Sequence, residues 1–266
     1  MIYINTLGRN GRLGNQLFQY ATGYALAKKH NTHLSIPSKD ANEEYSQIVE
    51  TFELSNAIYN DFEGIKSHYE EGSFSYNPHL MNLSDGVNIK GYFQSEKYFS
   101  HVKSELINKE FKFKYNVELN GRDSLERLCL NDKILCSIHL RMGDYLNSPA
   151  FHNGLPIEYY LKCINKISEM EDVSRVHYLV FSDDIQRTRE FFKECNLQMS
   201  FIDTDYQNTI WLMSKCKHHI IANSSFSWWG AWLSSSEGMV FAPSIWFGVA
   251  GPQNWHDIYC ERWVIV

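Results

Sequence analysis

The 266-residue chain contains 25 Lys and Arg residues against 31 Asp and Glu residues, a formal net charge of -6, and 44% of its residues are hydrophobic. The net negative charge argues against a nucleic-acid-binding protein, because such proteins usually carry a basic surface that neutralises phosphates. The apolar fraction and the 6 prolines exclude a mainly disordered chain, and the length allows one large domain or two modest ones.

The N-terminal residues lack the basic start and apolar run of a signal peptide, and no stretch reaches the roughly 18 apolar residues of a membrane span. We therefore expect a cytoplasmic protein. The six cysteines are scattered without a C-x-x-C pair, which predicts reduced thiols in the core rather than a zinc site or a disulfide framework.

The chain opens with the apolar residues MIYIN (1–5), a glycine-bearing loop GRNGRLGN (8–15) and a helix with apolar residues on one face. LSIP (34–37) is expected to be a second strand. From about residue 40 to residue 120, Tyr, Phe, Asn and Ser are frequent and no period is evident. This part predicts a mixed and less regular lobe.

Residues 133–244 alternate short apolar runs with stretches of helical period, which is typical of a parallel sheet covered by helices. The run ILCSIHLR (134–141) is nearly continuous in apolar residues, as expected for a buried central strand. The polar stretch 120–133 suggests a boundary, so we predict an N-terminal lobe of residues 1–125 and a nucleotide-binding C-terminal lobe of residues 126–266.

The segment HLRMGDY (139–145) follows the expected central strand. Ligands of open α/β sheets bind at the carboxyl ends of the strands, which places Arg141 at such a site. A forked guanidinium is well suited to bridge diphosphate oxygens and to stabilise the charge of a leaving nucleotide. The alternative is a structural ion pair between Arg141 and Asp144 that shapes the loop.

The segment GRLGNQLFQYA (11–21) leads from a glycine loop into a helix, where backbone N–H groups and the helix dipole favour an anion. It matches neither G-x-x-x-x-G-K-[ST] nor G-x-G-x-x-G, and this excludes a nucleoside kinase of the P-loop type. A tight turn that packs the helix onto the sheet is the alternative.

The segment IIANSSFSWWGAWL (220–233) turns from an apolar strand into a helix through a run of serines. Their hydroxyls can cap the helix or bind a phosphate. Trp228, Trp229 and Trp232 have helical spacing and are expected in the core. FSDD (181–184) ends another strand and offers Asp183 and Asp184 as acceptors for a base or ribose, or as a helix cap.

Together, GRLGNQLFQYA, HLRMGDY, FSDD and NSSFSWWGAWL resemble, in order and over nearly the whole chain, the motifs of bacterial α-1,2-fucosyltransferases of glycosyltransferase family 11. The resemblance implies an α/β fold of the GT-B type, with two Rossmann-type lobes facing a cleft and the C-terminal lobe the more regular. It also implies catalysis without a metal or other cofactor. GDP-fucose would be the donor substrate.

Carried onto this sequence, the resemblance places Arg141 against the β-phosphate of GDP-fucose and Asp183 near the guanine. The full set of residues that it assigns to donor binding comprises Gly14, Asn15, His139, Arg141, Asp183, Ser224, Ser225 and Phe226. Arg141 and Asp144 are the expected catalytic residues, although Asp144 could instead orient Arg141 and the general base is not identified. Met142 departs from the family pattern, which has a second arginine there.

The implied reaction is inverting transfer of L-fucose to the 2-hydroxyl of a terminal galactose of an oligosaccharide or polysaccharide repeat unit. A fucosyltransferase of other linkage, a transferase for another GDP-sugar, and a non-catalytic sugar-nucleotide-binding or lectin-like protein remain as alternatives. The expected partners are GDP-fucose and a galactose-terminated glycan. The composition also permits transient docking at a membrane surface that carries a lipid-linked acceptor.

Overall fold

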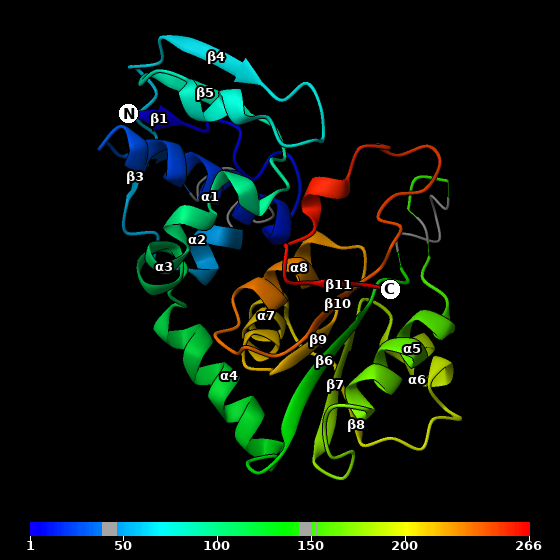
Figure 1. The fold of residues 1–266 in the computed structure, drawn as a ribbon. Coiled ribbons are helices and arrows are strands. Elements are labelled where there is room, and N and C mark those ends of the chain that lie inside the picture. The colour runs from blue at the N-terminus through cyan, green and yellow to red at the C-terminus, as the bar shows by residue number, and fades with distance from the viewer. Residues whose placement is uncertain (39–46, 144–149, 153) are drawn as a thin grey trace. The chain divides into compact units, whose positions relative to one another are not determined.

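A computed structural model of the protein describes residues 1–38, 47–143, 150–152 and 154–266 (Figure 1). The chain forms two compact units. The first contains Met1–Lys114 and Asn254–Cys260, and the second contains Tyr115–Gln253 and Glu261–Val266. The boundary predicted at residue 125 falls inside helix α4 (Tyr115–Arg127), which belongs wholly to the second unit. The return of residues 254–260 to the first unit has no signal in the sequence.

The first unit is built on a five-stranded sheet with the order β3-β2-β1-β5-β4. All of its paired strands run parallel. The strands are β1 (Ile2–Tyr3), β2 (Leu34–Ile36), β3 (Ala57–Tyr59), β4 (Ser67–Glu70) and β5 (Val87–Lys90). Three of them, β3, β4 and β5, lie within residues 40–120, where the sequence predicts a mixed and less regular lobe but does not locate any strand.

Helix α1 (Leu13–Lys29) packs against β1 and β2. Its residues are buried almost without interruption from Leu13 to Ala27, so it is a core helix rather than a surface helix. Lys28 and Lys29 in its last turn complement the negative end of the helix dipole. The shorter helices of this unit are α2 (Gln47–Thr51), α3 (Lys103–Glu105), four 3-10 turns (Pro78–Asn82, Glu96–Tyr98, Ser100–Val102, His256–Ile258) and a π turn (Leu106–Glu110).

The second unit contains a six-stranded parallel sheet with the order β11-β10-β9-β6-β7-β8. Its strands are β6 (Ile134–Leu140), β7 (Val176–Ser182), β8 (Met199–Ile202), β9 (His218–Ile220), β10 (Val240–Ala242) and β11 (Val264–Ile265). Strands β6 and β7 have 7 residues each, whereas the strands described in the first unit have at most 4 residues. The C-terminal lobe is therefore the more regular one, as predicted.

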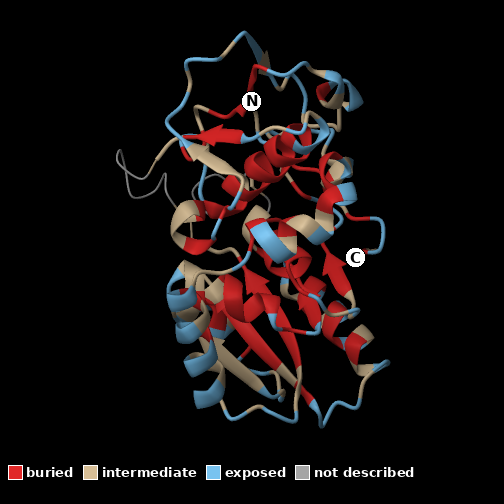
Figure 2. Ribbon diagram, turned by 90° about the vertical axis from the view of Figure 1, so that its left-hand side faces the viewer, coloured by how far each residue is buried: buried red, intermediate tan, exposed pale blue. Residues whose placement is uncertain are grey.

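The remaining helices of the second unit are α4, α5 (Ile157–Ser168), α6 (Ile185–Phe191), α7 (Tyr206–Ser214) and α8 (Ser225–Trp232). Helix α5 contributes Tyr160, Ile164 and Ile167 to a core shared with β6 and β7. Figure 2 shows that buried residues are concentrated in the sheet of the second unit. Burial of strand residues such as Ile138 and Val180 explains why both strands read as continuous apolar runs.

The predicted core positions of the tryptophans in α8 are confirmed, because Trp228, Trp229 and Trp232 are fully buried. All six cysteines are free. Four of them are buried as expected, whereas Cys195 is half-buried and Cys129 is exposed, so the expectation of core thiols fails for those two.

Candidate functional site

The residues that the sequence singles out in the second unit gather at the carboxyl ends of three neighbouring strands. Strand β6 lies between β9 and β7, with Ile138 opposite Ile220 and Leu140 opposite Ser182. Arg141 follows β6 and Asp183 follows β7, so both emerge side by side at one edge of the sheet. This edge is where open α/β sheets bind their ligands.

Asp183 holds the loop that follows β6. Its Oδ2 lies 3.2 Å from Arg141 Nε, and both side chains are about one-fifth exposed (20% and 21%). The same carboxylate accepts hydrogen bonds from the backbone N–H groups of Met142 at 2.8 Å and Gly143 at 3.1 Å. The ion partner of Arg141 in the described part of the chain is therefore Asp183. Asp144, which the sequence offers as that partner, lies outside the described residues.

Met142, which stands where the family has a second arginine, packs against the hydrophobic core of the second unit. Its sulfur lies 3.7 Å from the hydroxyl of Thr188, which donates to it. Since neighbouring residues leave a strand end in opposite directions, Arg141 and Met142 have different environments. The apolar side chain therefore suits its position.

His139 is buried near the end of β6, with 5% of its surface exposed. Burial, and after it the positive charge of Arg141, lowers the pKa of His139 to about 3. The imidazole is therefore neutral at physiological pH and leaves the positive charge at this edge to Arg141. Its ring centroid is 6.0 Å from that of Phe226, and its Nδ1 has no hydrogen-bond partner among the residues that the structure describes.

The start of α8 is organised by side-chain hydrogen bonds. Ser224 is the N-cap residue, and its hydroxyl accepts a hydrogen bond from the backbone N–H of Phe226 at 3.3 Å. Asn223 donates from Nδ2 to the carbonyl oxygen of Trp246 at 3.0 Å. Of the two roles that the sequence allows for the serine run, helix capping by Ser224 is thus present. Ser225 occupies the first position of the helix.

The glycine loop lies in the first unit. Gly11 adopts φ +101°, a conformation that favours glycine, and a Cβ atom there would lie 2.1 Å from Asn15 Nδ2. Gly14 is buried in the first turn of α1. The Leu13 N–H, which begins the helix, donates to Gln47 Oε1 at 2.7 Å. At least one backbone N–H group at the start of α1 is therefore already hydrogen-bonded within the first unit.

Asn15 is paired with a residue that the sequence did not single out. Gln94 Nε2 donates to Asn15 Oδ1 at 2.7 Å, and Gln94 is 7% exposed. Gln94 comes shortly after β5, so recognition of that strand would have placed it at the edge of the first sheet. Within the second unit, the structure brings together His139, Arg141, Asp183, Ser224 and Phe226, while Gly14 and Asn15 belong to the first unit.

Over the described residues, no three His, Cys, Asp or Glu side chains are arranged to hold a metal ion. In the same parts of the chain, no helix is both long enough and apolar enough to span a membrane.

The polar groups described above at the edge of the second sheet are the Arg141 guanidinium, the Asp183 carboxylate, the neutral imidazole of His139 and the Ser224 hydroxyl. A guanidinium held by a carboxylate is a typical recognition group for phosphate oxygens.

Known proteins resemble this chain over most of its length. The family model described as glycosyl transferase family 11 matches residues 1–266. Alpha-1,2-colitosyltransferase of Escherichia coli is 30% identical, with 96% of each chain covered. The O-antigen biosynthesis glycosyltransferase WbnK of Escherichia coli is 28% identical over 96% of this chain and 98% of the relative. Galactoside 2-alpha-L-fucosyltransferase SEC1 of Bos taurus is 23% identical over 89% of this chain and 66% of the relative.

Solved structures share the fold at low sequence identity. POFUT1 in complex with GDP superposes with a TM-score of 0.56 at 12% identity, covering 89% of this chain and 95% of that chain. NodZ alpha-1,6-fucosyltransferase soaked with GDP-fucose gives 0.56 at 13% identity, covering 88% and 92%. The α/β fold of the GT-B type, with two Rossmann-type lobes, is thereby confirmed.

Proposed function

Because this chain belongs to glycosyl transferase family 11, we propose that it is a galactoside α-1,2-fucosyltransferase that uses GDP-β-L-fucose and inverts the anomeric centre. Support for the linkage comes from two relatives, one named a 1,2-colitosyltransferase and one named a galactoside 2-fucosyltransferase. Support for the donor comes from solved structures of the same fold, one in complex with GDP and one soaked with GDP-fucose.

The observation that carries the proposal is the Arg141–Asp183 pair at the carboxyl edge of the second sheet. In the reaction, the acceptor oxygen forms a bond to the anomeric carbon while the bond from that carbon to the phosphate oxygen breaks, and negative charge accumulates on GDP. Arg141 would stabilise that charge, and Asp183 would hold the guanidinium in place. One well-placed donor of this kind commonly contributes about 3 to 4 kcal/mol to transition-state stabilisation.

The other residues would act around this pair. Ser224, Ser225 and the N-terminal end of α8 would face the anionic part of the donor, and His139 with Phe226 would line the nucleoside side. The family resemblance assigns Asn15 and Gly14 to donor binding as well. Asp144 is the candidate to accept the proton of the attacking hydroxyl, and the reaction would need no metal.

A colitosyl group is the second candidate for the transferred sugar, because a relative with 30% identity over nearly the whole chain is named for it. A non-catalytic sugar-nucleotide-binding protein is the remaining alternative. The cytoplasmic location, and transient docking to a membrane that carries the acceptor, belong to the same proposal and would be tested by cell fractionation.

The test is release of GDP from GDP-fucose or GDP-colitose, with and without lactose as the galactoside, in buffer containing EDTA. We expect acceptor-dependent release from GDP-fucose that EDTA does not reduce, and NMR of the product should show fucose on the galactose 2-hydroxyl. A preference for GDP-colitose would show that GDP-colitose, and not GDP-fucose, is the donor. A different linkage in the product, or release independent of any acceptor, would contradict the proposal.

A further inference from the structure

Glu71 forms a clamp at the carboxyl edge of the first sheet. It follows β4, whose last residue Glu70 pairs with Lys90, the last residue of β5. The Glu71 carboxylate accepts hydrogen bonds from the backbone N–H groups of Tyr92 at 2.7 Å and Phe93 at 3.1 Å. Gly91 makes this approach possible, because a Cβ there would lie 2.5 Å from Glu71 Cβ.

The clamp holds the backbone in an uncommon conformation. Phe93 is fully buried and has φ +52°, in the left-handed region that side-chain-bearing residues rarely adopt. Such strain persists only where the surroundings fix it, and it concentrates at ligand-binding and active sites. Burial raises the pKa of Glu71, while the two backbone hydrogen bonds act in the opposite direction by favouring the carboxylate.

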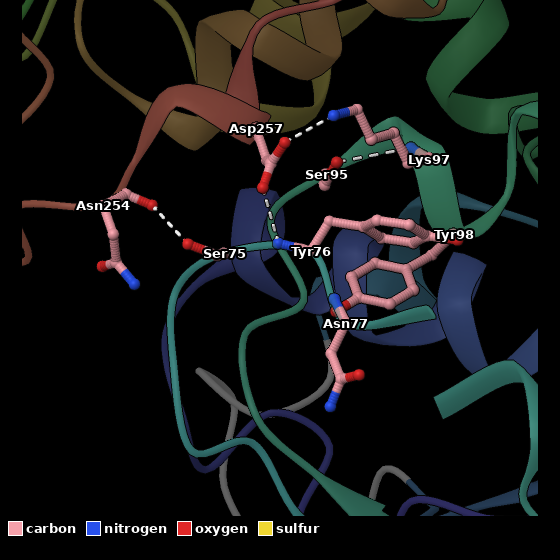
Figure 3. Close-up of polar contacts among 8 residues, drawn as sticks. All are labelled: Ser75, Tyr76, Asn77, Ser95, Lys97, Tyr98, Asn254 and Asp257. Carbon is pink, nitrogen blue, oxygen red and sulfur yellow. Dashed lines mark hydrogen bonds and ion pairs between the residues drawn. The ribbon is translucent and has the colours of Figure 1, made fainter. Parts of the chain in front are cut away.

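The residues that follow Phe93 are also held by Asn254–Cys260, the C-terminal segment that belongs to the first unit (Figure 3). Asp257 Oδ1 lies 2.5 Å from Lys97 Nζ, and Asp257 Oδ2 accepts from the Tyr76 N–H at 2.8 Å. The Tyr98 hydroxyl accepts from the Asn77 N–H at 2.8 Å. Residues 91–98 are therefore anchored at both ends by carboxylates from other segments.

Two side chains of residues 91–98 differ in exposure, because Gln94 is buried and Tyr92 is exposed. Gln94 turns to Asn15, the residue of the glycine loop that the family resemblance assigns to the donor. Tyr92, two residues earlier, keeps 42% of its surface exposed. An exposed aromatic ring on a rigid backbone, at the carboxyl edge of a parallel sheet, suits a carbohydrate subsite in which the ring covers an apolar sugar face.

We propose that Tyr92 is a stacking platform for a hexose ring of the acceptor glycan, and that Glu71 is the positioning residue that holds this platform in place. The inference rests on the proposed function in that the acceptor is a glycan. It assigns acceptor specificity to residues 91–94, which lie in the part of the chain that carries no recognisable sequence motif.

The experiment combines kinetics with binding in the absence of a donor. The Tyr92→Ala variant should raise the KM for lactose about tenfold, corresponding to about 1.4 kcal/mol, while Tyr92→Phe stays close to wild type. Tyr59→Ala is the matched control, because Tyr59 is also 42% exposed and ends β3 in the same sheet. Glu71→Gln should raise the lactose KM and leave the GDP-fucose KM within about twofold, whereas the exposed neighbour Glu70→Gln should change neither constant.

Saturation-transfer NMR with lactose alone separates this inference from the proposed reaction. Wild type and Tyr92→Phe should transfer saturation to lactose ring protons, and Tyr92→Ala should not. Absence of fucosyl transfer in wild type together with this binding pattern would overturn the proposed function only. Equal lactose signals in wild type and Tyr92→Ala, no lactose signal in wild type, or equal rises of both KM values in Glu71→Gln would overturn the subsite.

Discussion

At the scale of single residues, one carboxylate organises the donor side of the site. Asp183 receives three N–H groups, from the Arg141 side chain and from the backbone of Met142 and Gly143. A carboxylate can accept all three, whereas a neutral amide of the same shape has only one oxygen. Asp183 therefore sets the position of the guanidinium and of the backbone at Met142 and Gly143, and this role could not be deduced from the FSDD motif alone.

Asp183→Asn should reduce kcat/KM for fucosyl transfer by about 10- to 100-fold, because its NH2 group would oppose an N–H donor and release the loop. Acceptor-dependent GDP release measures this effect. The control is Asp184→Asn next to it, where the native side chain caps α6 by accepting from the Arg187 N–H at 3.0 Å. Asp184→Asn should leave turnover unchanged, and an equal loss in both variants would contradict the assigned role of Asp183.

At the scale of elements, helix α7 lies between α4 and α8 and packs closely against both. The contacts depend on glycines in the two outer helices. A Cβ at Gly121 of α4 would lie 2.3 Å from ring atoms of Trp211, and a Cβ at Gly230 of α8 would lie 2.7 Å from the sulfur of Met213. The indole is rigid and the thioether is flexible, so the two contacts differ in how far they can relax.

Gly121→Ala should therefore lower the free energy of unfolding by about 1 to 3 kcal/mol despite the better helix propensity of alanine, and Gly230→Ala should cost less. Denaturant titration followed by circular dichroism would measure both values. Asn120→Ala, at an exposed position of α4, is the control and should not destabilise the protein. A Gly121→Ala variant as stable as wild type would show that α4 and α7 do not pack as described.

The sequence predicts some strands and not others, and the reasons are burial and length. Strands β6 and β7 are buried on both faces, so their apolar runs are evident in the sequence. Strand β4 reads SHYE and is largely exposed at the sheet edge, so it has neither an apolar run nor alternation. Strand β5 reads VNIK and is mostly buried, but it has only 4 residues and contains Asn88, so it forms no apolar run either. Glu71 and Gln94, which follow β4 and β5, could therefore not be placed at a sheet edge. Arg141 and Asn15 could be identified from the sequence because each lies in a motif of the family.

At the scale of the whole molecule, buried neutral histidines make stability depend on pH. Burial lowers the pKa values of His139 and His219 to about 3. Both side chains lie in the second unit, and the Nδ1 atom of His219 is 2.8 Å from the hydroxyl of Ser137. Above the unfolded-state pKa of about 6.5, both are neutral in the folded and unfolded states and have no effect on this dependence.

Below pH 6.5 both histidines become protonated in the unfolded chain but stay neutral in the folded chain. The free energy of unfolding should therefore fall as the pH decreases towards 3. Each histidine adds up to about 1.4 kcal/mol per pH unit to this slope. Denaturant titrations between pH 7 and pH 4 should show a shallower slope in His219→Asn than in wild type. The exposed His79→Asn variant is the control, and identical slopes in all three proteins would refute the explanation.

The proposed stabilisation of the leaving GDP by Arg141 is most directly tested by the Arg141→Lys variant, in which a point charge replaces the guanidinium fork. We expect kcat/KM for acceptor-dependent GDP release from GDP-fucose to fall by about 100- to 1000-fold, with the protein folded and lactose binding retained. Near-normal turnover of Arg141→Lys would contradict the assignment of Arg141 as the residue that stabilises the leaving diphosphate.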